Sequence, residues 1–314
     1  MTAQSTPMVP SARWSRRIAL FSVGLILAAL VLHRLAALPT PLAINLFIVG
    51  YAGAVLAVPI GLVALARIWI TGHAGAGSAA AAIVLPLMAL AGPLVYLQAL
   101  LDLPRINDVT TDPAAPPSFL ALAKRGAGAN PVAYPGKQFA ELQAKAYPDL
   151  RPLVLDRSVA EAYELVEEAV QRLRWRVVTE EAPTMGRSPK PGLIEAIDQT
   201  LIVGFTDDIV IRVEGSATRA RIDVRSASRY GRFDFGQNAA RLRRFLAEVR
   251  ARAEATPSAA VAAKKPDPLQ SGEGARELLK RQKGRDQLKA ESRNEPGPAK
   301  SDARRAPARK ETPR

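Results

Sequence analysis

The sequence predicts a membrane-anchored α+β protein: three transmembrane helices, then a two-layer domain with an antiparallel sheet and two main helices. Two observations lead to this prediction. Residues 18–101 are almost entirely apolar, whereas the chain beyond them is mixed in character and rich in basic residues. In that second part, two amphipathic stretches enclose several short runs of alternating polarity. This order is typical of a sheet with helices on one face.

Three apolar runs, at residues 18–32, 42–66 and 79–101, are candidates for crossing a bilayer, which takes about 20 helical residues. The first run has an apolar continuation to residue 38. In the second run, small residues recur at four-residue spacing and would let another helix approach closely, so another membrane protein is a candidate partner. This face consists of Gly50, Gly53, Ala54 and Ala57.

The charges beside the runs predict their orientation, because Lys and Arg are in excess on the cytoplasmic side of a membrane. We therefore expect a bacterial cytoplasmic (inner) membrane protein whose N-terminus is inside and whose chain after residue 101 is extracytoplasmic. If the first run is instead a cleaved signal peptide, the two remaining spans leave the soluble part on the same side. The arginines compared are Arg13, Arg16, Arg17 and Arg67 against Arg34 and Arg105.

Composition divides the chain into five segments. The connecting segment, residues 105–155, contains many prolines, which exclude regular helix. We therefore expect extended chain that packs on the domain through its aromatic residues, with a short helix at 138–146. The last segment lacks apolar periodicity and is predicted to be disordered, with helical potential only at 275–291. The segments are a cytoplasmic N-terminus (1–17), three spans (18–104), a connecting segment (105–155), the α+β domain (156–253) and a basic tail (254–314).

The domain begins with the clearest helix of the soluble part. Ser158 and Glu161 have the spacing of a capping box, and an apolar stripe follows to residue 173. Strands are expected at 175–179, 193–198, 209–213 and 219–225, with a continuation of the second over 201–205, before a last helix at 235–252. Adjacent acids at Asp207 and Asp208 are expected to form a turn.

The last predicted strand has two contrasting faces. Its apolar side chains point one way, as expected for a face that packs on the core. The alternate residues are charged, so we expect one face of the sheet to be hydrated and cationic. Those residues are Arg219, Arg221, Asp223 and Arg225.

A dense polar loop joins this strand to the last helix, and two interpretations stay open. In the first, the loop satisfies its own polar groups: Asp234 and Gln237 form a capping box, and Asp234 neutralises Arg229 or Arg232. In the second, the helix N-terminus and the arginines bind an anion, such as a headgroup phosphate. The candidate residues are Arg225, Ser226, Ser228, Arg229, Arg232, Asp234, Asn238 and Arg241.

A second polar cluster lies at the start of the connecting segment. Oxygen atoms of this kind suit a hard cation, but no second cluster accompanies them, so no metal site is predicted. The residues are Asp108, Thr110, Thr111 and Asp112.

These two clusters carry a resemblance to a known family. The pattern S-x-S-R-x-G-x-x-D-x-G-x-N-x-x-R at residues 226–241, with F-x-D-D at 205–208 and I-N-D-V-T-T-D at 106–112 followed by P-P-S-F at 116–119, is similar to a bacterial and plastid family that is known only as a domain of unknown function. The aromatic residues Tyr230, Phe233 and Phe235 depart from its pattern. The resemblance implies no reaction and no catalytic residues.

The residue inventory limits the function. The chain has no cysteine, and its two histidines, His33 and His73, lie in or beside the apolar part, so we predict no catalytic residue and no cofactor. The net charge of +14 favours anionic partners.

We therefore expect a non-enzymatic extracytoplasmic interaction or structural module, in contact with the lipid bilayer and with anionic lipid or a wall polymer. Nucleic acid is not expected. The alternatives are a nucleic-acid-binding domain, if the soluble part is cytoplasmic, and an enzyme that uses carboxylates and arginines.

Overall fold

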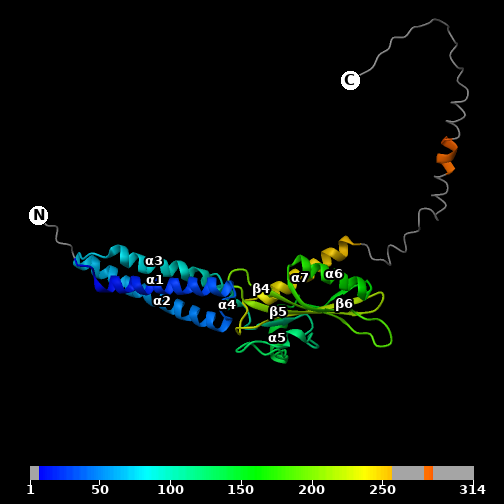
Figure 1. Cartoon of the computed structure of the whole chain (residues 1–314), viewed down its shortest axis with the longest axis horizontal. Coiled ribbons are helices and arrows are strands. Elements are labelled where there is room, and N and C mark those ends of the chain that lie inside the picture. Colours follow the sequence, from blue (N-terminus) through cyan, green and yellow to red (C-terminus); the bar gives the residue numbers. More distant parts are fainter. Residues whose placement is uncertain (1–6, 257–278, 286–314) are drawn as a thin grey trace, which may run out of the picture. The chain divides into compact units, whose positions relative to one another are not determined.

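The computed structural model describes residues 7–256 and 279–285 (Figure 1). Three long helices come first, each long and apolar enough to cross a membrane. This character supports association with a lipid bilayer. The helices are α1 (Pro10–Arg34), α2 (Thr40–Thr71) and α3 (Ala76–Leu94), and the short α4 (Leu97–Asp102) follows a turn after α3. The predicted third span therefore consists of two helices.

The small-residue face of α2 is covered by α1. A Cβ atom on Gly50 would lie 2.6 Å from Ile26 Cγ1, and one on Gly53 would lie 2.2 Å from Ser22 Oγ. Ala54 and Ala57 on the same face are fully buried. Small side chains let two helix backbones approach closely, and the chain uses this face for its own first helix. The predicted docking face for another membrane protein is thus already occupied.

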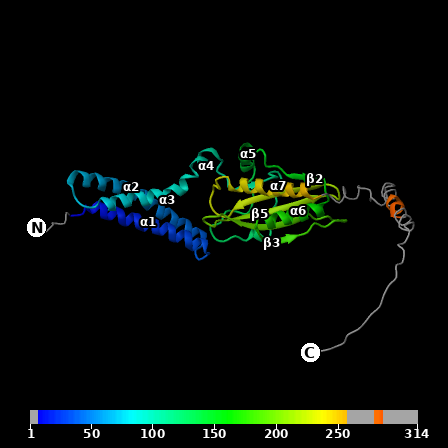
Figure 2. The ribbon, with the colours of Figure 1, turned by 90° about the horizontal axis from the view of Figure 1, so that it is seen from above.

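The soluble part is built on one antiparallel sheet (Figure 2). The strand order is β1-β6-β5-β4-β3, and β2 pairs with the beginning of β6 while β1 pairs with its end. The strands are β1 (Asp108–Thr110), β2 (Leu153–Leu155), β3 (Arg176–Glu181), β4 (Gly192–Gln199), β5 (Thr206–Gly215) and β6 (Ala220–Ser228).

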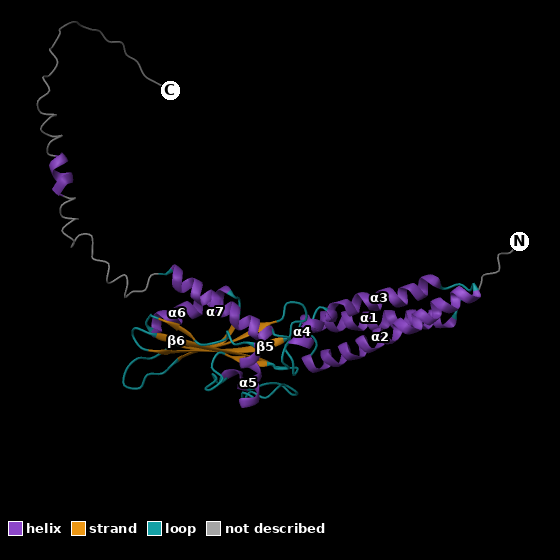
Figure 3. Ribbon diagram, turned by 180° about the vertical axis from the view of Figure 1, so that it is seen from behind, coloured by secondary structure: helices purple, strands orange, loops and turns teal. Residues whose placement is uncertain are grey.

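Helices α6 (Val159–Arg172) and α7 (Gln237–Ala255) cover one face of this sheet, and α5 (Lys137–Ala146) lies on the other (Figure 3). The main core lies under α6 and α7, where Trp175 stacks on Phe245 with 5.5 Å between the ring centroids. Ser158 caps α6, since its Oγ accepts from the Glu161 amide while the Glu161 carboxylate accepts from the Ser158 amide. The predicted α+β fold class is confirmed.

The face expected to be hydrated is largely covered by the connecting segment. Glu195 in β4 accepts hydrogen bonds from three successive amides, those of Leu120, Ala121 and Leu122. This contact fixes the short 3-10 turn η1 (Ala121–Ala123) on the sheet. Phe119 and Leu122 then form a small second core with Ile197, Val210 and Ala227. As a result, Asp223 and Arg225 are buried, and only Arg219 and part of Arg221 remain accessible.

Two further local predictions are wrong. Residues 201–203 form a turn instead of a strand, and Asp207 and Asp208 lie inside β5, not in the turn before it. Buried arginines reach both carboxylates, which is why these acids are accommodated within a strand.

Most of the predicted disordered tail, residues 254–314, falls outside the described residues. Its described part is the end of α7 and a helical stretch at 279–285.

Candidate anion site

Arg225 is the centre of the first polar cluster, at the end of β6. Its Nε and Nη2 donate to the two carboxylate oxygens of Asp108 in β1, at 2.9 and 2.7 Å. Its Nη1 donates to the carbonyl of Pro117 at 3.1 Å, and its Nη2 donates also to the carbonyl of Val132 at 2.8 Å. The guanidinium also lies 4.8 Å from the ring centre of Phe119. Arg225 therefore fastens the connecting segment to the sheet, with four of its five N–H groups used in these contacts.

Arg241 of α7 organises the part of the polar loop (residues 225–241) that lies on the helix-covered face. It bonds to Asp207 and Asp198, each at 2.7 Å, and donates to Ser226 and Asn238. Asn238 in turn accepts from Ser226 and donates to Ser228. The predicted loop residues therefore do come together here, as a closed hydrogen-bond network that joins α7 to the sheet.

Asp234 stabilises the start of α7 in a different way from the one predicted. Its two carboxylate oxygens accept from the amides of Gly236 and Asn238, both at 2.9 Å. The helix begins at Gln237 with Gly236 as its N-cap, so Gln237 is not in the third position that a capping box requires. Burial raises the pKa of Asp234, although the two backbone amides oppose this effect. With a carboxylate already on these amides, the helix N-terminus does not offer them to another anion.

Arg229 does not pair with Asp234; its partner is the fully buried Asp208, at 2.7 Å. Arg125 from the connecting segment forms a second ion pair with the same carboxylate, at 3.0 Å between Nε and Oδ2. Arg125 Nη1 donates to the carbonyl of Asn130, at 3.1 Å. Its Nη2, however, is buried and has no hydrogen-bond partner among the described residues, in a side chain that is only 4% exposed.

The electrostatics around Arg125 are unbalanced. Burial is the main reason that its pKa is lowered, and repulsion from Arg225 and Arg229 adds to the effect, while Asp208 and Asp108 act in the opposite direction. Three arginines here share two carboxylates. A buried guanidinium with an unused N–H group and surplus positive charge around it is suited to an additional anion.

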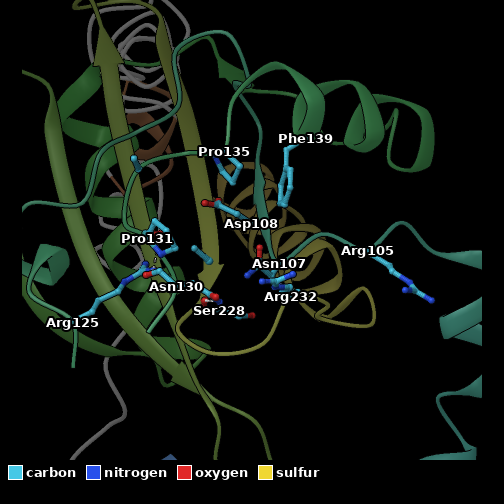
Figure 4. A pocket seen from close by; sticks show the side chains of 12 residues that line it. Arg105, Asn107, Asp108, Arg125, Asn130, Pro131, Pro135, Phe139, Ser228 and Arg232 are labelled. Carbon is cyan, nitrogen blue, oxygen red and sulfur yellow. Dashed lines mark hydrogen bonds between the residues drawn. The ribbon is translucent and has the colours of Figure 1, made fainter. Parts of the chain in front are cut away.

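A pocket of about 380 Å³ opens beside Arg125, between the connecting segment, α5 and the end of β6 (Figure 4). Arg105 and Arg232 also line it; both are exposed, and neither has an ion pair within the part of the chain that the structure describes. Figure 4 shows Arg125 and Asn130 on one side of the pocket and Phe139 and Arg105 on the other. The other lining residues are Asn107, Asp108, Pro131, Ala133, Pro135, Ala227 and Ser228.

The second predicted cluster, at the start of the connecting segment, does not converge on one point. Asp108 pairs with Arg225, and Thr111 donates to the Val224 carbonyl and accepts from its amide. Asp112 bonds to Arg212 and Arg221, at 3.1 and 2.7 Å. The backbone of Thr110 is held by the Gln143 side chain of α5. These oxygens already have cationic or backbone partners, so the cluster acts as an attachment to the sheet.

Of the predicted candidates, only Arg232, Asp108 and Ser228 line the pocket. Sequence reasoning missed Arg125 and Arg105. Each lies among prolines or beside a glycine in the connecting segment, where no periodicity marks a role. For Asp208 the sequence predicts a turn, whereas the structure places it in β5 as the shared partner of Arg125 and Arg229. The signal that could have identified it is its place in the F-x-D-D pattern, upstream of several arginines.

One comparison with known proteins bears on this part of the chain. A family model described as "Protein of unknown function (DUF1499)" matches residues 108–249, from β1 to α7. This supports the resemblance to a family whose function is unknown, and it adds no activity. No curated protein matches the chain.

Proposed function

We propose that this protein is a membrane-anchored binding module, which holds its α+β domain outside the cytoplasm and binds a phosphate-bearing anionic group in the pocket beside Arg125. The observation that carries this proposal is the buried Nη2 of Arg125, which has no partner among the described residues. Burying such a donor without a hydrogen bond costs about 1–3 kcal/mol. An anionic oxygen in the pocket would supply the missing acceptor.

The charge around the pocket supports an anion over a neutral ligand. Five arginines lie in or next to it, against the two carboxylates of Asp108 and Asp208, and both of these are already paired with arginines. The guanidinium fork matches the oxygen geometry of phosphate. Because neither carboxylate is free to act as a base, the arrangement favours binding over acid–base catalysis. The five are Arg105, Arg125, Arg225, Arg229 and Arg232.

The surroundings of the pocket favour a phospholipid headgroup as the source of the phosphate. Arg105 follows the end of α4 by three residues, and α4 follows the apolar helices directly. The loop after β6 contacts the same region, since the Phe235 and Tyr96 ring centroids are 5.2 Å apart. The pocket wall also contains Pro131, Pro135 and Phe139, which suit the apolar part of an amphiphile.

The test is calorimetric titration of the full chain in a neutral detergent with three probes: dihexanoyl phosphatidic acid, dihexanoyl phosphatidylcholine and inorganic phosphate. We expect the phosphatidic acid to bind. The double variant Arg105→Ser with Arg232→Ser removes two pocket charges that form no ion pair among the described residues. It should weaken binding at least about tenfold if each contact contributes about 1 kcal/mol.

Arg219→Ser provides the matched control. Arg219 is exposed and lies at the turn between β5 and β6, at the opposite end of β6 from the pocket. Equal loss of binding in this control would mean that net charge, not the pocket, attracts the ligand. Binding of inorganic phosphate as tight as that of phosphatidic acid would favour a free anion over a lipid, and no binding of either would refute the proposal.

The side of the membrane is tested separately, by phosphatase and fluorescent-protein fusions after Ala253. Phosphatase activity is expected there. Fluorescence would place the domain in the cytoplasm and make cytoplasmic polyanions the leading ligands.

A further inference from the structure

The turn between β4 and β5 holds two large apolar side chains in solvent. Leu201 is 87% exposed and Ile202 is 68% exposed. The turn is closed by its own hydrogen bonds, from the Thr200 amide to the Phe205 carbonyl at 2.9 Å and from the Phe205 amide to Thr200 Oγ1 at 2.9 Å. Its backbone is therefore held by these bonds, and both side chains remain exposed within the described part of the chain.

The same turn contacts the junction between the first two apolar helices. His33 at the end of α1 bonds through Nδ1 to the Val203 carbonyl, at 2.8 Å, and through Nε2 to Thr40 Oγ1 in α2, at 3.0 Å. The His33 and Phe205 rings lie 5.4 Å apart. A Cβ atom on Gly204 would lie 3.2 Å from Arg34 Cδ. The tip of the β4–β5 turn, which consists of Leu201 and Ile202, is thus attached to the junction between α1 and α2 at residues 33–40.

Length places this junction at the boundary of the hydrocarbon core. The strictly apolar part of α1, residues 18–32, spans only about 23 Å at 1.5 Å per residue. A typical core is about 30 Å thick. To cross it, α1 has to bring its last turn and the exposed Leu35 up to the edge of the core. Any group that contacts His33 and Arg34 therefore lies at the depth of the headgroups.

We propose that the β4–β5 turn is a membrane contact, in which Leu201 and Ile202 insert into the interfacial layer of the bilayer beside the end of α1. Burial of apolar side chains drives this insertion, and the internally bonded turn leaves few polar groups to desolvate. The proposal depends neither on the anion pocket nor on which side of the membrane the domain faces. It requires only that α1 and α2 span the bilayer.

The chain contains no cysteine, so a single introduced cysteine can be spin-labelled without background labelling elsewhere. Ile202→Cys carries the label at the tip, and Leu201→Cys repeats the test at the neighbouring position. Met185→Cys is the matched control: Met185 is 58% exposed and lies between β3 and β4. Because successive strands are antiparallel, that connection is at the opposite end of β4.

The full chain is reconstituted into phosphatidylcholine vesicles, and collisions of each nitroxide with oxygen and with a water-soluble nickel chelate are measured by electron paramagnetic resonance. Oxygen concentrates in lipid and the chelate in water. We expect oxygen to dominate at 202 and 201, and the chelate to dominate at 185. Equal access of the chelate to all three positions would overturn the proposal. Shielding of 202 from both reagents would overturn it too, by showing that protein covers the tip.

Discussion

The most direct test of how the connecting segment is attached is to replace Arg225 by methionine. Arg225 makes a two-point ion pair with Asp108, and both residues are almost completely buried. Methionine keeps most of the side-chain volume and removes the charge. The Asp108 carboxylate then remains buried without its main partner, which typically costs about 3–5 kcal/mol. For a domain of this size, that loss lowers the melting temperature by about 6–20 °C.

Trp175 is a convenient reporter for this experiment, because it is buried in the main core and stacks on Phe245. Replacing Trp14 and Trp69 by phenylalanine leaves its fluorescence as the single tryptophan signal of unfolding. Arg219→Met is the matched control, since this exposed arginine has no ion pair among the described residues; its effect should stay within about 0.5 kcal/mol.

The pH dependence gives a second readout of the same variant. Burial already raises the pKa of Asp108, and the hydrogen bond and charge of Arg225 partly oppose this. Without Arg225, the pKa rises further. When the folded pKa of a carboxyl group exceeds its unfolded value of about 3.9, the folded state binds more protons between these two pKa values. The free energy of unfolding therefore falls as the pH rises from the unfolded pKa through the folded pKa. The variant should therefore approach the wild type in stability as the pH is lowered from neutral through the raised pKa of Asp108.

Removing both partners should restore much of the lost stability, because Asp108→Leu in the Arg225→Met background leaves no unpaired buried charge. If Arg225→Met melts no lower than the Arg219→Met control, or if its loss is the same at every pH, then the Asp108–Arg225 pair does not hold the connecting segment as described.

Two further substitutions test other parts of the fold. Glu195→Gln keeps the side-chain shape but places an amide donor against the backbone amides that donate to the Glu195 carboxylate. We therefore expect the free energy of unfolding to fall by about 1.5–3 kcal/mol and hydrogen exchange to become faster at residues 120–122. Unchanged exchange at these residues would contradict the anchoring role. Gly215→Ala should lower the melting temperature far more than Gly136→Ala, although both glycines have positive φ. A Cβ atom at 215 would lie 2.2 Å from the Arg219 carbonyl oxygen, whereas one at 136 would meet nothing within 4 Å. Equal melting temperatures would contradict the close approach of the backbone at Gly215.

The general architecture could be predicted from local patterns. Long apolar runs, the Ser158 capping box and the strand character of β6 depend on residues close together in sequence, and each forms as expected. Where a residue's role depends on a distant partner, the same reasoning failed. Asp208 has the sequence context of a turn residue, but in the structure Arg125 and Arg229 form ion pairs with its two carboxylate oxygens.

The candidate site shows the same division. The polar loop at residues 225–241 could be recognised, and its interpretation as a self-satisfied corner accounts for most of its residues, including Arg241 and Asn238. The interpretation as an anion site stays a prediction, although most of the donors that it named are already paired. Arg105 and Arg232, which form no ion pair among the described residues, differ from their paired neighbours in which acids the fold brings within reach.

By itself, the sequence determined that this chain has membrane-type helices, a mixed α+β domain and an excess of positive charge, because hydrophobic periodicity and composition are local properties. Only the tertiary structure decided which charges are neutralised and which side chains stay exposed. Burial and ion pairing depend on segments more than one hundred residues apart, such as Asp108 and Arg225 or His33 and Val203. Among the described residues, those distant contacts leave Arg125 Nη2 without a hydrogen-bond partner and leave Leu201 and Ile202 exposed, and the two proposals depend on these features.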